Sequence, residues 1–281
     1  MKKVIHNNKV CSINDFNISI FDRGLTLGSG IFETIMITKK SIPFLDYHWD
    51  RLITSGKITG IKIPFSKNEL EKTIFELISH NDASAYELGV RLTITEGIAE
   101  RGILAPDDIE PNFFITLFEN VQNNLPWTAI ISSVRRNEGS PTSMVKSISY
   151  MDNIFAKKEA AEKNANEAIL LNNKGHIAEG AISNIFLVSK QGTLLTPRIE
   201  DGALPGVTRR TIIDNFSKDE VIEEKTITLN DLINAEEVFL TNALMGIKEI
   251  TKIDSFFESK SNPKTTSLKN RFANLLKNGI G

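Results

Sequence analysis

Alternating hydrophobic and polar positions dominate the start of the chain. Between Val4 and Ile20, short apolar runs alternate with Asn, Lys and Ser, which predicts an opening β-hairpin. The glycine-rich segment Phe21–Gly30 predicts a turn, because glycine is common where the backbone needs unusual dihedral angles. The apolar run Ile31–Thr38 then predicts a strand, with Lys39 and Lys40 at its hairpin tip. The chain therefore begins as a sheet.

The pattern then changes to helical periodicity and back again. Apolar residues recur three or four positions apart in Asp46–Thr59 and in Asn68–Ile78, which predicts two helices. Leu88–Thr95 and Asn112–Phe118 are apolar, β-branched runs separated by Gly and Pro, and we expect two further strands there. These elements form one N-terminal group.

The second half again mixes strands and helices. Strong helix formers predict a helix from Met151 to about Ala165, and further helices are expected at Gly206–Ile213 and Thr265–Leu276. Glu237–Thr241 is expected to be the last strand, followed by the turn Asn242–Gly246. The other expected strands cover residues 128–134, 167–171, 183–188 and 193–196.

A polar connector separates the two halves. Glu119–Pro126 is rich in Asn and contains a proline, as interdomain linkers often do. We therefore expect an N-terminal domain over residues 1–119, a linker over 120–126 and a C-terminal domain over 127–281. A chain of 281 residues that is 41% hydrophobic is long and apolar enough for two packed cores.

Composition narrows the class of protein. A formal net charge of −2 gives no general attraction to nucleic acid or membrane surfaces, so a small-molecule partner is favoured. The single cysteine, Cys11, excludes an internal disulfide framework and a cysteine zinc cluster, and the scattered histidines lack paired ligand spacing. Neither a signal peptide nor a membrane span is visible, which predicts a cytoplasmic protein.

A lysine and a distant acid are the first candidates for chemistry. Lys146 stands in the polar and β-branched segment Pro141–Tyr150, and Glu179 lies in a glycine-flanked turn before an apolar strand. Such a pair is what a pyridoxal phosphate site needs, because lysine forms the imine and an acid keeps the pyridine nitrogen protonated. Taken singly, Lys146 could be a solvated lysine and Glu179 an ordinary turn acid.

Candidate phosphate contacts are also present. Gly206–Thr208 stands at a helix start, where free N–H groups and the helix dipole attract anions, and Asn242–Ala243 is a second tight turn. Arg51 could add a charge-assisted contact, although it could equally be a surface helix residue. Gly28 and Gly30 do not make a dinucleotide fingerprint, because Glu33 occupies the position of the third glycine.

Together, these ordered motifs resemble the class IV, fold type IV pyridoxal phosphate enzymes. The resemblance covers nearly the whole chain and rests on the following segments: Asp22–Thr34, His48–Arg51, Lys146, Glu179–Phe186, Gly206–Arg209 and Thr241–Gly246. It implies an α+β fold of two domains, a small α/β N-terminal domain and a larger C-terminal pseudo-barrel domain that binds pyridoxal 5′-phosphate. It also implies a homodimer whose active sites borrow a loop from the partner subunit.

The resemblance assigns roles to individual residues. Lys146 would bind the cofactor as an imine and later shuttle a proton, and Glu179 would pair with the pyridine nitrogen. Arg101 matches the arginine that binds the substrate carboxylate in the lyases and D-amino acid aminotransferases of the family. The other implied cofactor contacts are Arg51, Tyr150, Val207, Thr208, Asn242 and Ala243, and the other implied substrate-facing residues are Phe32, Glu33 and Thr38.

Within the family, the turn Thr241–Ile247 resembles that of the aminodeoxychorismate lyases. This favours a lyase that converts 4-amino-4-deoxychorismate to 4-aminobenzoate and pyruvate in folate biosynthesis. The alternatives are an aminotransferase acting on D-amino or branched-chain amino acids with 2-oxoglutarate, and a relative that keeps the fold without the cofactor. Four departures concern substrate specificity: Ser29 replaces the frequent Asp, Met36 and Glu96 each stand where Arg is common, and Lys248–Glu249 replaces a pair ending in Pro.

Overall fold

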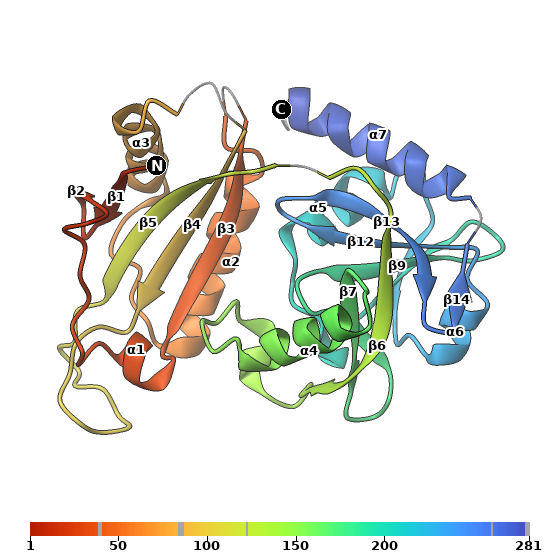
Figure 1. Ribbon diagram of the computed structural model, residues 1–281, viewed down its shortest axis with the longest axis horizontal. Coiled ribbons are helices and arrows are strands. Elements are labelled where there is room, and N and C mark those ends of the chain that lie inside the picture. Colours follow the sequence, from red (N-terminus) through yellow and green to blue (C-terminus); the bar gives the residue numbers. More distant parts are fainter. Residues whose placement is uncertain (39–40, 84–86, 122, 260, 279–281) are drawn as a thin grey trace. The chain divides into compact units, whose positions relative to one another are not determined.

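The protein forms two compact units. The computed structural model describes residues 1–38, 41–83, 87–121, 123–259 and 261–278 (Figure 1). The first unit comprises Met1–Val121 and Val145–Ser149, and the second comprises Gln122–Met144 and Tyr150–Gly281. The segment around Lys146 therefore packs with the first unit, although it lies far beyond that unit's last strand in the sequence. Lys39 and Lys40, expected at a hairpin tip, lie outside the described residues.

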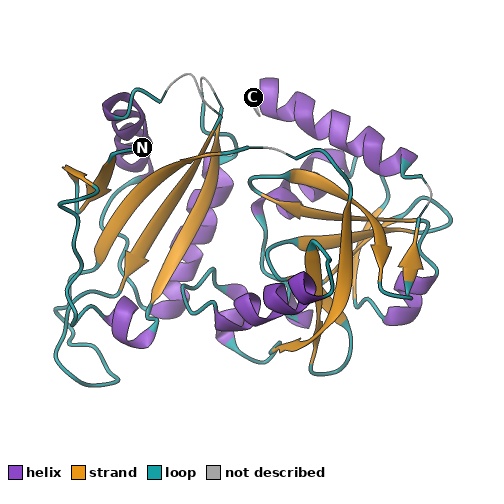
Figure 2. Ribbon diagram, in the orientation of Figure 1, coloured by secondary structure: helices purple, strands orange, loops and turns teal. Residues whose placement is uncertain are grey.

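The first unit is an antiparallel five-stranded sheet with helices α2 and α3 against one face (Figures 1 and 2). The strand order is β2-β1-β5-β4-β3, so β3 is an edge strand. The elements are β1 (Lys3–His6), β2 (Lys9–Ser12), α1 (Arg23–Leu27), β3 (Gly30–Ile37), α2 (Leu45–Thr59), α3 (Lys67–His80), β4 (Leu88–Thr95) and β5 (Asn112–Glu119).

Alternation along β3 divides its side chains between the two faces of the sheet. Ile31, Ile35 and Ile37 belong to the core that β3 shares with α2 and α3, where Leu52 and Ile74 are also buried. Because strand side chains alternate, Glu33 points to this same helix-covered face. A carboxylate thus lies among apolar side chains and needs a partner there.

The second unit is built on a nine-stranded mixed sheet that curves into a half-barrel. Helix α4 covers β6 and β7, and α7 packs on β12 and β13. The strands are β6 (Trp127–Arg136), β7 (Glu167–Asn172), β8 (Ile177–Gly180), β9 (Asn184–Val188), β10 (Leu194–Pro197), β11 (Ile222–Lys225), β12 (Glu237–Asn242), β13 (Gly246–Ile253) and β14 (Phe257–Glu258). The helices are η1 (Pro141–Met144), α4 (Met151–Glu162), η2 (Ile199–Asp201), α5 (Val207–Phe216), α6 (Leu229–Ile233) and α7 (Pro263–Asn278).

Most predicted elements are confirmed, and three expectations are wrong. The turn predicted at Phe21–Gly30 contains the short helix α1, which Asp22 caps by accepting from the Gly24 amide. Glu179 lies within strand β8 rather than in a turn. Glu237–Thr241 is not the last strand, because β13 and β14 follow it. In β13, isoleucine recurs at every third position with polar or charged residues between, so the strand lacks simple alternation, and pairing with β12 and β6 decides its conformation.

Candidate functional site

The Lys146 segment is attached to the open edge of β3. The Phe32 amide donates to the Lys146 carbonyl at 2.8 Å, and the Ile148 amide donates to the Gly30 carbonyl at 3.0 Å. An edge strand offers unpaired backbone groups, and these two bonds satisfy part of that edge. The Lys146 Nζ atom lies 4.4 Å from the centroid of the Phe32 ring. The backbone and side chain of the predicted imine lysine are therefore positioned by β3.

Arg51 is held by a buried carboxylate of the same unit. Its Nε donates to Glu33 Oε1 at 2.7 Å and its Nη2 donates to Glu33 Oε2 at 2.6 Å. His48 Nδ1, one turn earlier on α2, lies 2.7 Å from Glu33 Oε2. Although burial opposes ionisation, these partners lower the pKa of Glu33 to about 2. Burial in turn lowers the pKa of His48, which keeps its ring neutral near pH 7.

The three residues expected to face the substrate from β3 do not share one face of the sheet. Glu33 contacts α2 through Arg51 and His48, whereas Phe32 lies on the opposite face, where the guanidinium carbon of Arg91 is 3.8 Å from its ring centroid. Thr38 follows the end of β3 and donates its hydroxyl to the Ser41 carbonyl at 3.2 Å. Glu33 is therefore placed to orient Arg51.

Glu179 in the second unit is buried and ion-paired. Arg136 Nε lies 3.0 Å from Glu179 Oε1, and the Leu204 amide donates to Oε2 at 2.9 Å. The Arg136 guanidinium also donates to the carbonyls of Gly202 and Ser143. A cation and an N–H donor both stabilise the ionised carboxylate, which is the form that pairs with a protonated pyridine nitrogen. The sequence did not single out Arg136, because an arginine at a strand end carries no local signal.

The loop before α5 is fixed by Asn184 from β9. Asn184 Nδ2 donates to the Leu204 carbonyl at 2.8 Å, and a Cβ atom on Gly206 would lie 1.8 Å from Asn184 Oδ1. Glycine is therefore required for this close approach. Gly206 caps α5 without a side-chain hydrogen bond, so the first amides of the helix, at Val207 and Thr208, have no side-chain cap. Such a helix start is suited to an anion.

The second predicted anion turn is close to this helix start within the same unit. Thr241 on β12 pairs with Asn184 on β9, and α5 contacts β12. The Asn242 side chain accepts from the amides of Leu244 and Met245 and donates to the Ile182 carbonyl at 3.2 Å. These bonds shape the turn that contains Ala243. Tyr150, half-buried, is the N-cap residue of α4.

The arrangement in the second unit fits pyridoxal phosphate. The segment from Leu204 to Thr208 contacts Glu179 at its beginning and ends at the uncapped helix start. The cofactor carries a pyridine nitrogen and a phosphate on one small ring system, so it needs an acid and an anion site close together. Within the described residues, no group of three or more His, Cys, Asp or Glu side chains could hold a metal ion.

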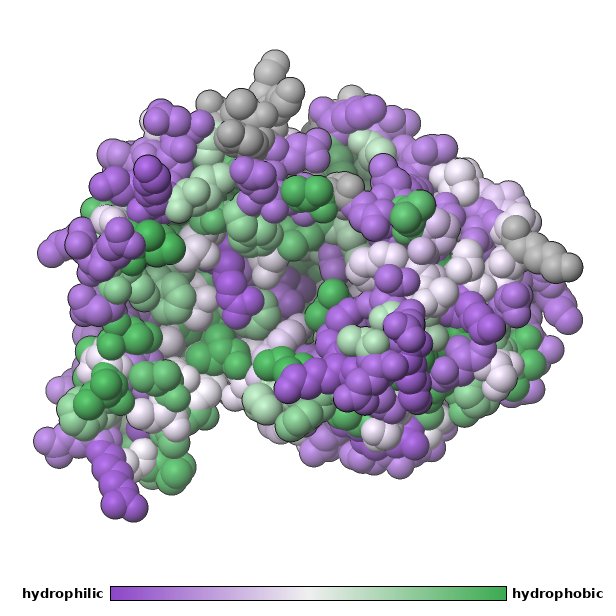
Figure 3. Space-filling view, viewed as in Figure 1, coloured by the Kyte–Doolittle hydropathy of each residue, from purple (hydrophilic) through white to green (hydrophobic). Residues whose placement is uncertain are grey.

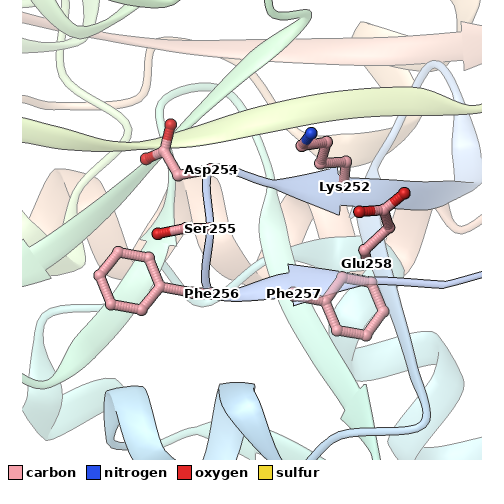
Figure 4. A pocket seen from close by; sticks show the side chains of 6 residues that line it. All are labelled: Lys252, Asp254, Ser255, Phe256, Phe257 and Glu258. Carbon is pink, nitrogen blue, oxygen red and sulfur yellow. The ribbon is translucent and has the colours of Figure 1, made fainter.

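Arg101 lies outside these groups, in the loop 96–111 between β4 and β5, and its side chain is exposed. A pocket of about 510 Å³ occurs elsewhere, at the β13–β14 hairpin (Figure 4). Its lining residues are Lys252, Asp254, Ser255, Phe256, Phe257 and Glu258, and none of them belongs to the predicted site. Asp254 accepts from the Ile131 amide at 2.7 Å, which identifies it as a structural residue of the hairpin.

Comparison with known proteins identifies the family. The family model described as "Amino-transferase class IV" matches residues 30–253. The chain is 33% identical to the aminodeoxychorismate lyase of Bacillus subtilis over 98% of its own length and 94% of that protein. It is 34% identical to a putative branched-chain-amino-acid aminotransferase of Methanocaldococcus jannaschii, with 90% and 88% covered, and 31% identical to a D-alanine aminotransferase of Listeria innocua, with 96% and 94% covered.

Solved structures agree with this result. A putative 4-amino-4-deoxychorismate lyase from Legionella pneumophila has a TM-score of 0.86 at 28% identity, covering 92% of this chain and 95% of that one. A branched-chain amino acid aminotransferase from T.th., solved with pyridoxamine 5′-phosphate, has a TM-score of 0.89 at 23% identity, with 98% and 93% covered. The predicted fold is thereby confirmed, and the class IV aminotransferase family match confirms pyridoxal phosphate as the cofactor. No described helix is both long and apolar enough to cross a membrane.

Proposed function

Because the chain belongs to the class IV aminotransferase family, we propose that it is a pyridoxal phosphate-dependent lyase converting 4-amino-4-deoxychorismate to 4-aminobenzoate and pyruvate. The observation that carries the proposal is the turn Thr241–Gly246, which resembles the lyase turn and is held by the Asn242 side chain. Similarity to the Bacillus subtilis lyase over nearly the whole chain supports it.

The two groups of residues have complementary roles in this proposal. Lys146 attaches the cofactor through its amine, and Arg51 together with the amides of Val207 and Thr208 binds the phosphate. Asn242 and Ala243 contribute through their turn, and Tyr150 contacts the cofactor. Glu33 orients Arg51 through two hydrogen bonds, which fixes the position of the planar guanidinium.

Glu179 supplies the charge that the reaction needs at the pyridine nitrogen. Arg136 and the Leu204 amide hold its carboxylate in one orientation. Bound against it, the cofactor supplies a conjugated electron sink for the substrate's amino carbon. Lys146, released when the substrate amine takes its place, accepts the proton from that carbon.

The products follow from the substrate's structure. Loss of that proton and departure of the enolpyruvyl group as pyruvate leave an aromatic ring, so 4-aminobenzoate forms without a second substrate. Phe32 lies next to Lys146, and its buried ring helps to position the lysine amine. Arg101 binds a substrate carboxylate in this proposal, as its position in the family motif suggests. The reaction places the enzyme in folate biosynthesis, and the absence of a disulfide framework is consistent with the cytoplasm.

The second candidate is an aminotransferase acting on D-amino or branched-chain amino acids with 2-oxoglutarate. The relatives with those names, at 31% and 34% identity, support this reading. Its first steps would use the same residues, but the reaction would need a keto acid to accept the amino group. The need for a keto acid therefore separates the two candidates.

We expect purified enzyme given 4-amino-4-deoxychorismate and no keto acid to release pyruvate and 4-aminobenzoate in equal amounts. Pyruvate is measured by absorbance in an assay coupled to lactate dehydrogenase, and 4-aminobenzoate is measured by its fluorescence. Lys146→Ala, the control, should lose the visible absorbance of the bound cofactor and the activity. Turnover of D-alanine or leucine with 2-oxoglutarate, without 4-aminobenzoate formation, would select the aminotransferase. A protein that never takes up pyridoxal phosphate would contradict both candidates.

A further inference from the structure

The segment Asp22–Arg23–Gly24 contacts both ends of the loop 96–111. Asp22 is fully buried and accepts from Thr95 Oγ1 at 2.8 Å and from Asn112 Nδ2 at 3.1 Å. Thr95 ends β4 and Asn112 begins β5, so one carboxylate holds both ends of the loop. The Arg23 amide also donates to the Gly97 carbonyl at 2.8 Å.

The Arg23 side chain extends this attachment into the loop itself. It is 4% exposed, and its Nε donates to Glu96 Oε2 at 2.8 Å. Its Nη1 and Nη2 donate to the carbonyls of Gly102 and Ile103 at 2.9 and 2.5 Å. All three nitrogens of a planar guanidinium are thus used to hold one loop, which a lysine could not reproduce. The two carbonyls directly follow Arg101.

Two departures from the family pattern meet at this same point. Ser29 and Glu96 lie far apart in sequence, but Ser29 Oγ donates to Glu96 Oε2 at 2.7 Å. The Glu96 amide donates to the Ser29 carbonyl at 3.0 Å. One carboxylate oxygen, Glu96 Oε2, therefore accepts from both Arg23 and Ser29.

Two glycines show how closely the segments approach. A Cβ atom on Gly24 would lie 2.3 Å from Thr95 Cγ2, and one on Gly97, whose φ is +112°, would lie 2.0 Å from the Glu110 carbonyl oxygen. The base of the loop is therefore closed and tightly packed. Beyond it the loop is exposed, with Ile103 and Leu104 at 79% and 88% exposure. Figure 3 shows hydrophobic surface over the part of this unit near α1.

We propose that Arg23 is a positioning residue that holds the loop 96–111 so that Arg101 can bind the substrate carboxylate. The role of Arg101 rests on the proposed function, whereas the attachment of the loop rests on the contacts of Arg23. Without Arg23, the backbone around Arg101 loses two charge-assisted hydrogen bonds, and the partly buried Glu96 carboxylate loses its cation.

Limited trypsin digestion of the holoenzyme tests the attachment directly. We expect Arg23→Gln to raise the rate of cleavage after Arg101 about tenfold or more, measured by mass spectrometry, because loosened backbone is cut faster. Arg23→Lys should raise it as well, since lysine lacks the planar fork. Cleavage after the exposed Lys218 is the internal control. Unchanged cleavage after Arg101, or an equal rise at Lys218, would overturn the proposal.

A double-mutant cycle tests the Ser29–Glu96 contact. Glu96→Arg alone should speed cleavage after Arg101, because it leaves two guanidinium groups together without a carboxylate. Adding Ser29→Asp should restore slow cleavage by supplying that carboxylate from the other segment. A double variant cleaved as fast as Glu96→Arg would show that the two residues do not act together.

Kinetics connect the loop to the substrate. In the lyase assay, Arg23→Gln should raise KM by more than it lowers kcat, with the visible cofactor absorbance unchanged. Arg101→Gln should likewise raise KM by more than it lowers kcat. If Arg101→Gln leaves KM unchanged, the assigned role of Arg101 is wrong, even if trypsin shows that Arg23 holds the loop. If Arg101→Gln raises KM and Arg23→Gln does not, positioning by Arg23 is wrong while the proposed function stands.

Discussion

Glu33 shows how a single buried carboxylate can organise a cation needed for phosphate binding. It receives two hydrogen bonds from Arg51 and one contact from His48, all beside a core made mostly of isoleucine and leucine. A buried charge without a partner would be strongly unfavourable, so Glu33 and Arg51 depend on each other. Loss of the Glu33 charge should therefore lower the free energy of unfolding by a measurable amount.

We expect Glu33→Gln to lower the free energy of unfolding at pH 7 by about 3 kcal/mol, from the difference between the usual pKa of 4.5 and the folded value of about 2. Because the folded pKa is lowered, this stabilisation is fully present above pH 4.5 and disappears as pH falls toward 2. Urea denaturation of wild type and variant between pH 7 and 3 measures it. Glu119→Gln, at an exposed position, is the control. A difference that does not shrink with falling pH would contradict the prediction.

Among the elements, the loop into α5 depends most on one small residue. Gly206 packs against Asn184, whose amide also holds Leu204, so the helix start and the strand that supports it are locked together. A helix N-terminus binds an anion only if its amides point in fixed directions. The affinity for the cofactor should therefore depend on this contact.

Gly206→Ala should weaken binding of pyridoxal phosphate about tenfold or more, because its Cβ would lie 1.8 Å from Asn184 Oδ1 and must displace the loop. Spectrophotometric titration of the apoenzyme measures the affinity. Gly139→Ala is the matched control, since its Cβ would only come within 3.5 Å of Asn137 Oδ1. Equal affinities of the two variants would show that the loop adapts without cost.

At the scale of the whole molecule, the exposed tip of the loop 96–111 bears on the homodimer that the resemblance to the family implies. Ile103 and Leu104 are the kind of exposed apolar residues that a protein interface covers. Light scattering should give about twice the chain mass of 31.3 kDa. Leu104→Glu should shift the protein toward monomer, whereas Val221→Glu, at another exposed apolar position, should not. A monomeric wild type would contradict the prediction.

The sequence predicted the residues that carry the chemistry, but not the residues that hold them in position. Lys146, Glu179 and Gly206–Thr208 are part of short motifs, and such motifs are local in sequence. Arg136 beside Glu179 and Asn184 beside Gly206 were missed as functional residues, since each acts on a residue in a different element. Strand β8 was missed because its four residues are buried on all sides and show no alternation.

The amino-acid sequence alone was enough to predict most strands and helices, the family and the cofactor. Periodicity and motif spacing act within one element, so they can be seen along the chain. The tertiary structure decided which distant residues meet: Glu33 with Arg51, Ser29 with Glu96, and Arg23 with the carbonyls after Arg101. Such contacts depend on strand register and on packing between elements, and a single sequence carries no local trace of either.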